Sequence, residues 1–259
     1  MSPLQGFVPL FRRELTGLWR TWRLAVALGA ALLTGLGSPV LAYAIPALIE
    51  RIPPEDMKGM AILLLQKPGL TDALVQLQKN LGMMPILLAL LGMSTVSADR
   101  GGMDVLIFTR PASPAAYLLS KAAAGALLAG MIAVVSGVCF VPGATLLFGP
   151  LVLPDYLALC GLNALLLLWA WCCMLIGAAC NRGAPLAAAA GIGGTLGLGL
   201  LGLYPSVAAW TPAGLNLAAA ALIQGEVVPH HGLPAVGSTL LGVALLLALA
   251  VRVTRRAGR

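Results

Sequence analysis

Six long apolar segments dominate this sequence and constrain its fold more than any other feature. A helix needs about 20 mostly apolar residues to cross a bilayer. The segments lie at roughly 24–45, 83–98, 116–140, 157–179, 185–203 and 234–252, and we expect the short second one to extend by a turn at each end. Only 10% of the 259 residues are charged and 59% are hydrophobic, which is more apolar surface than a soluble domain of this size could bury. The sequence therefore predicts an all-α integral membrane protein, with six transmembrane helices in a single domain that covers residues 1–259.

The basic residues are distributed unevenly between the two ends of this predicted bundle. Twelve Lys and Arg residues lie at the end that holds both termini and the loops after the second and fourth segments, and four lie at the other end. Loops rich in Lys and Arg stay in the cytoplasm. We therefore expect a multi-pass protein of the plasma (inner) membrane with both termini cytoplasmic and with residues 46–82 and 204–233 extracytoplasmic. The net charge of +7 follows from this asymmetry, so we do not interpret it as nucleic-acid binding.

The first apolar segment also has features of a cleaved signal peptide. Arg12-Arg13 precedes it, and Ala42-Tyr43-Ala44 resembles a cleavage site. However, the apolar run is longer than the core of a signal peptide, and the residues before it form a patterned helix. We therefore interpret residues 24–45 as a retained span.

Residues 7–23 show the clearest amphipathic pattern in the chain. One face of the predicted helix is apolar and the other polar, with Phe7, Leu10, Phe11, Leu15, Leu18, Trp19 and Trp22 on the first and Arg12, Arg13, Thr16, Arg20 and Arg23 on the second. Such a helix lies in the plane of the membrane interface, and its arginines face phosphates or a partner. Glu14 falls within the apolar face. Its carboxylate needs a partner, so we expect an internal pair with an arginine, a side chain that reaches water, or a contact at a subunit joint.

Two shorter helices are predicted toward the extracytoplasmic side. Thr71 can cap a short helix with Leu74, Leu77 and Leu81 on one face, and we expect this helix to lie on the outer membrane surface. Residues 214–223 are apolar but too few to span the bilayer. We interpret them as a re-entrant or interfacial helix.

The loop at residues 99–114, between the second and third segments, contains a further helical pattern. Its apolar run from Val105 to Phe108 needs a surface to cover it, which argues against a simple solvated turn. Gly101-Gly102 precedes the pattern and Pro111 ends it. The residues that share a face are Met103, Leu106, Ile107 and Arg110. We expect a short cytoplasmic coupling helix.

Several short motifs occur in a defined order around the first two spans. They are Phe11-Arg12-Arg13-Glu14-Leu15, then Asp99-Arg100, Met103-Asp104-Val105-Leu106-Ile107, Arg110-Pro111-Ala112-Ser113 and Tyr117-Leu118-Leu119-Ser120-Lys121. Together with the six-span layout they resemble the membrane subunit of an ABC-2-type transporter. The chain departs from that pattern in its shortened acidic lead-in, in the absence of Thr around Gly102 and in Pro114, where the family has Arg.

The resemblance implies that the head helix and the loop helix form the docking surface for a separate ABC ATPase subunit. It assigns the reception of ATPase motion to Arg12, Arg13, Glu14, Asp99, Arg100, Asp104 and Arg110. It also implies an exporter with a second permease copy, in a homo- or heterodimer. ATP and Mg would be bound by the ATPase, so we expect no cofactor in this chain. The alternatives are a haem-exporter-type or assembly-factor permease, or a membrane protein that does not transport.

Motifs of catalysis and of metal binding are missing from the sequence. It contains no Gly-Lys dipeptide and hence no Walker A loop, and no HExxH or GxSxG motif. His230-His231 could bind a metal, but two adjacent histidines do not make a site and an exposed pair is favoured; the five cysteines fit buried apolar positions. We therefore predict that the chain is not an enzyme and holds no metal.

The polar residues within the predicted spans are few. These spans contain no Asp or Glu, and Lys121 and Arg252 lie near cytoplasmic ends where their side chains can reach water. Ion-coupled carriers place ionisable groups in mid-membrane, so we expect energy to be supplied from outside the membrane. Asn163 is the polar side chain that we most expect to face a substrate path or a partner helix. Gly193 and Gly197 permit close helix packing, within the subunit or across a dimer.

Overall fold

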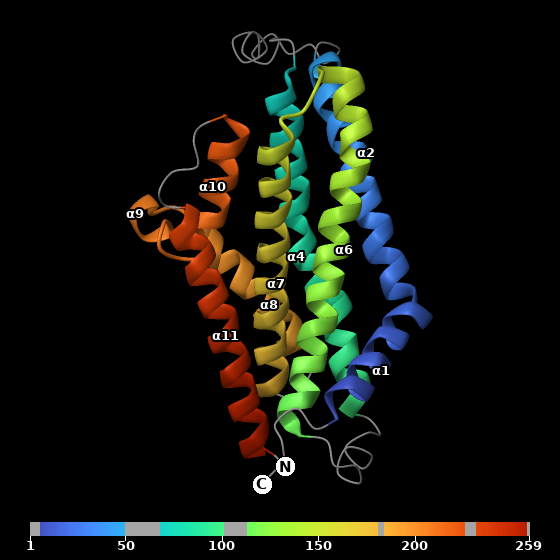
Figure 1. Cartoon of the computed structure of the whole chain (residues 1–259), viewed down its shortest axis with the longest axis vertical. Helices are drawn as coiled ribbons and strands as arrows, with labels where there is room; N and C mark the ends of the chain where they lie inside the picture. The colour runs from blue at the N-terminus through green and yellow to red at the C-terminus, as the bar shows by residue number, and fades with distance from the viewer. Residues whose placement is uncertain (1–5, 50–67, 101–112, 181–183, 226–231, 258–259) are drawn as a thin grey trace.

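The protein folds as a helical bundle, which Figure 1 shows from the side. This computed structural model describes residues 6–49, 68–100, 113–180, 184–225 and 232–257. Within these ranges the chain forms helices and no strand. The helices are α1 (Phe7–Arg20), α2 (Trp22–Ile49), α4 (Leu70–Arg100), α6 (Pro114–Phe148), α7 (Leu153–Cys180), α8 (Ala184–Leu201), α9 (Pro205–Ala208), α10 (Gly214–Ile223) and α11 (Gly232–Ala257).

Six of these helices are long and apolar enough to cross a membrane: α2, α4, α6, α7, α8 and α11. Their exposed surface is rich in large apolar side chains, such as Leu33, Val138 and Leu241. Because such a surface is stable only in lipid, the chain is a multi-pass membrane protein. The prediction of an all-α protein with six spans is confirmed.

Helix α7 lies at the centre of the bundle. It packs against α8, α11, α6, α4 and α10, and its inner residues from Trp171 to Leu175 are almost fully buried. Small residues allow this close packing. A Cβ at Gly125 of α6 would clash with the indole of Trp171, and one at Gly35 of α2 would clash with the Ser136 carbonyl of α6. The glycines thus let the helices approach more closely than larger residues would permit.

Helix α4 differs from the two separate elements that the sequence predicts. It is one helix of 31 residues, so residues 70–82 are its first part and not a surface helix outside the membrane. Thr71 lies inside the helix, and the cap is formed instead by Asp72, whose carboxylate accepts a hydrogen bond from the Gly69 backbone N–H at 2.8 Å. Leu77 and Leu81 are buried in the bundle core. Burial against neighbouring helices therefore stabilises residues 70–82 as a helical part of the span, although they contain several polar side chains.

Helix α10 is the short apolar helix predicted at residues 214–223. Seven of its ten residues are buried, against α7, α11 and α4. It lies beside the half of α7 that is farther from α1 (Figure 1). Since its apolar side chains face protein, α10 belongs to the bundle and is not an isolated surface helix.

Helix α6 begins at the end of the bundle where α1 lies and runs its full height (Figure 1). The hydroxyl of Ser113 caps it by accepting a hydrogen bond from the Ala116 backbone N–H at 3.0 Å, and Pro114 occupies its first turn. It continues for 35 residues to Phe148 and so extends beyond the predicted span. It packs against α2, α7, α1 and α11.

Candidate functional site

Helix α1 lies across the bundle at the end where α4 finishes and α6 begins (Figure 1). It packs chiefly against α6 and less extensively against α2. The predicted helix at residues 7–23 is interrupted at Thr21, whose backbone is extended, and α2 starts at Trp22. The Thr21 hydroxyl donates to the Gly17 carbonyl at 2.8 Å and so closes the last turn of α1. The chain therefore turns sharply between a transverse helix and the first span.

The apolar face of α1 divides between the bundle and the surroundings. Leu18 packs against the bundle core, and the rings of Phe7 and Phe11 stack on each other with centroids 5.7 Å apart. Trp19 and Trp22 instead expose 79% and 67% of their surface. In an interfacial helix, exposed indoles of this kind lie at the level of the lipid headgroups.

Glu14 makes an ion pair with Lys121, the second-turn lysine of α6. The amine donates to the carboxylate at 2.8 Å, and the exposed fractions of the two side chains are 2% for Lys121 and 13% for Glu14. Of the three alternatives expected for Glu14, the structure shows the internal ion pair, but the partner is a lysine and not an arginine. The prediction that Lys121 reaches water is wrong, because the ion pair makes burial of its charge tolerable.

The surroundings of Lys121 bring three helices together. Its amine lies over the Tyr117 ring, 5.1 Å from the centroid, in a cation–π arrangement. The indole N–H of Trp171 in α7 donates to the Lys121 carbonyl at 3.0 Å. This cluster of Glu14, Lys121, Tyr117 and Trp171, the α1 anchor, therefore connects α1 to α6 and α6 to α7.

The other predicted coupling residues are only partly described. Arg12 is exposed on α1, and Arg13 is half-buried and takes part in a further interaction. The backbone of Asp99 and Arg100 forms the last turn of α4, which ends close to α1 (Figure 1). Asp104, Arg110 and the predicted coupling helix lie outside the described residues. The structure thus packs the head helix against α6, which follows the loop, and it adds Lys121 as a residue of the site.

Asn163 lies in the contact between α7 and α4. Its amide donates to the Gln78 side chain at 2.8 Å and to the Leu159 carbonyl at 2.9 Å, and only 3% of the residue is exposed. Nearby, the Asn80 amide donates to the Ser38 hydroxyl of α2 at 2.9 Å. Sequence reasoning missed Gln78 and Asn80 because it placed them outside the second span. Gln78 and Asn80 lie between Leu74 and Leu81, in a segment whose leucines share one helical face, and this pattern indicates that the helix packs against others.

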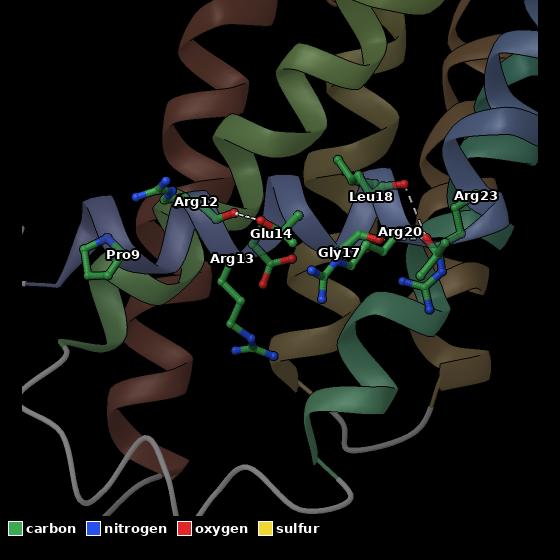
Figure 2. A pocket seen from close by; sticks show the side chains of 10 residues that line it. Pro9, Arg12, Arg13, Glu14, Gly17, Leu18, Arg20 and Arg23 are labelled. Atoms are coloured by element: carbon green, nitrogen blue, oxygen red, sulfur yellow. Dashed lines mark hydrogen bonds between the residues drawn. The ribbon is translucent and has the colours of Figure 1, made fainter.

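An open cavity of about 610 Å³ follows the polar side of α1 (Figure 2). It is lined by α1 and the first residues of α2: Pro9, Arg12, Arg13, Glu14, Thr16, Gly17, Leu18, Arg20, Thr21 and Arg23. Four arginines are therefore among the residues that line this concave surface, and the one carboxylate in the lining, that of Glu14, is already paired with Lys121. A smaller cavity of about 130 Å³ lies at the other end of the bundle, between the starts of α4 and α7 and the end of α10.

The described part of the chain contains no group of three or more His, Cys, Asp or Glu side chains that could hold a metal ion. His230 and His231 lie outside the described residues. The five cysteines are free thiols, and Cys172 and Cys173 are buried within α7. A comparison of the sequence with models of protein families finds no match, and a comparison with curated proteins finds none either.

Proposed function

We propose that the chain is the membrane subunit of an ATP-driven transporter, an ABC-2-type permease that works as an exporter in the plasma (inner) membrane. A separate ATPase subunit would bind on the cytoplasmic side, at α1 and the loop of residues 99–114. The observation that carries this proposal is the buried ion pair between Glu14 and Lys121. It fastens the transverse helix, which a cytoplasmic partner can reach, to a helix that spans the membrane.

Both the loop of residues 99–114 and helix α1 are attached to the first two turns of α6. The loop leads directly into α6 at Ser113, and α1 is tied to Lys121, eight residues further on. A displacement of either element therefore acts on the same segment of one helix. This arrangement suits a protein that receives motion from a partner, since two separate attachment points constrain both the position and the tilt of α6.

The packing of α6 provides a route from this segment into the bundle. At about 1.5 Å per residue, its 35 residues extend for roughly 50 Å. Along this length α6 contacts α2, α7 and α11, and the Trp171 hydrogen bond connects the α1 anchor to the central helix. A rigid-body shift of α6 would therefore change several helix contacts together, as a change between inward- and outward-open states requires.

The distribution of charge within the spans agrees with an external source of energy. Within the six candidate spans, of which the one in α4 covers Leu70–Met93, the acidic residues are Asp72 and Asp155, both in the first turn of their helices. Both are far from mid-membrane, where ion-coupled carriers place their ionisable groups. ATP and Mg would be bound by the partner, and a second permease copy would complete the transport path.

The test is to purify the tagged full chain from its native membranes in mild detergent and to measure ATP hydrolysis by the complex. We expect a co-purifying subunit with a Walker A lysine, and we expect hydrolysis to disappear when that lysine is changed to alanine although the complex still assembles. The isolated chain should not hydrolyse ATP. A native complex without a nucleotide-binding subunit, or hydrolysis by the chain alone, would refute the proposal.

A further inference from the structure

The junction between α1 and α2 repeats one pair of side-chain types. Trp19-Arg20 ends α1, and Trp22-Arg23 begins α2, with the extended Thr21 between them. Both indoles are exposed, Arg20 is exposed and Arg23 is half-buried. Two aromatic and two cationic side chains thus lie within five consecutive residues at this junction, and three of the four are exposed.

The depth of this junction follows from its place in the chain. Trp22 is the first residue of the first candidate span, and α1 runs across the end of the bundle just before it. Residues at such a boundary lie where acyl chains give way to headgroups, and tryptophan prefers this level. Arg20 and Arg23 therefore lie at the depth of the phospholipid phosphates.

The two arginines border one end of the cavity along α1 (Figure 2). The cavity volume of about 610 Å³ falls within the range of roughly 300–1,000 Å³ that is usual for ligand sites. Among the described residues, neither guanidinium has a hydrogen-bonded or ionic partner. Glu14, the one carboxylate in the lining, is neutralised by Lys121 and does not offset their charge.

We propose that Arg20 and Arg23, flanked by Trp19 and Trp22, bind the phosphate of an acidic phospholipid headgroup at this junction. Guanidinium groups recognise phosphate oxygens through paired hydrogen bonds, and the indoles contact the glycerol and the upper acyl chains. A soluble phosphate would use the arginines but gain nothing from the exposed indoles. The exposed indoles therefore favour a lipid over a free anion. The lipid would bind at the last turn of α1 and the start of α2, whereas the α1 residues assigned to the ATPase contact are Arg12, Arg13 and Glu14, earlier in the helix.

The test uses the full chain in nanodiscs of phosphatidylglycerol and phosphatidylcholine in a ratio of 1 to 3. Native mass spectrometry after release into detergent measures which lipid the protein retains. Loss of one guanidinium that hydrogen-bonds a bound phosphate should weaken binding at that site by at least about fivefold. We therefore expect the preference for phosphatidylglycerol to fall about fivefold in Arg20→Gln and about 25-fold in Arg20→Gln/Arg23→Gln.

The matched control is Arg252→Gln, which removes an exposed arginine from α11. It should retain phosphatidylglycerol as the wild type does. If the arginines acted only through general electrostatic attraction, Arg252→Gln and Arg20→Gln would instead lose the preference equally. Arg20→Lys/Arg23→Lys should lose part of the preference, since an ammonium group lacks the paired donors.

Three results would overturn the proposal. The first is an equal preference in wild type and the Arg20→Gln single variant, which changes only an exposed side chain and should fold. The second is displacement of the retained lipid by millimolar inorganic phosphate, which would identify a free-anion site. The third is unchanged lipid retention together with loss of ATPase attachment, which would make the junction a protein contact.

Discussion

Removal of Glu14 should destabilise the protein more than removal of its partner. In Glu14→Ala the Lys121 amine, only 2% exposed, is left buried without its carboxylate. Breaking a buried pair in this way costs on the order of 3–5 kcal/mol. In Lys121→Met the remaining carboxylate of Glu14 is 13% exposed and closer to water. The free energy of unfolding should therefore fall by only about 1–3 kcal/mol. The asymmetry follows from the burial of the two groups and not from the distance between them.

The double variant Glu14→Ala/Lys121→Met distinguishes an ion pair from two independent contacts. Because apolar residues can replace a buried pair at little cost, we expect it to be more stable than Glu14→Ala alone, with a coupling energy of roughly 2 kcal/mol or more. SDS titration of the purified chain gives the free energies of unfolding, and limited proteolysis within α1 reports its detachment. Additive effects of the two single changes would refute the inferred pairing.

Three further predictions concern packing and topology. Gly125→Ala should destabilise the bundle by about 1–3 kcal/mol because the added methyl group meets an indole of α7, whereas Gly130→Ala, whose Cβ position is open, should be neutral in the same SDS titration. Asn163→Leu should lower the free energy of unfolding by roughly 1–3 kcal/mol because it leaves the Gln78 side-chain amide of α4 without its partner. SDS titration of the detergent-purified protein would measure this decrease. A single cysteine introduced by Lys58→Cys should react with a membrane-impermeant maleimide from outside intact cells only. Labelling from the cytoplasm alone would contradict the predicted topology.

The number of spans could be predicted because hydropathy depends on composition, but helix lengths depend on contacts. Residues 70–82 contain Asp72, Gln76, Gln78, Lys79 and Asn80, so their mean hydropathy alone argues against a span. In the structure the amides of Gln78 and Asn80 bond to α7 and α2, which removes much of the cost of burial. A sequence pattern shows the polar groups but not the partners that satisfy them.

The candidate site shows the same limit. Helical periodicity identified α1 and the anomalous position of Glu14, since both depend on local spacing. Its partner Lys121 lies 107 residues away, and its burial results from the packing of α1, α6 and α7. The family-like motif contained Lys121, yet composition alone favoured a side chain that reaches water. Only the tertiary contact shows that the head helix and α6 are joined.

The most direct test of the central proposal is photocrosslinking from α1 to the ATPase subunit. A photoreactive amino acid replaces Arg12, which is exposed on α1, and in a matched control it replaces Leu33, which is 71% exposed on the lipid-facing surface of α2. In native membranes we expect the first position to form an adduct with a nucleotide-binding subunit and the second to form none. An ATPase complex that assembles normally but gives no adduct at position 12 would contradict the assignment of α1 as the docking helix.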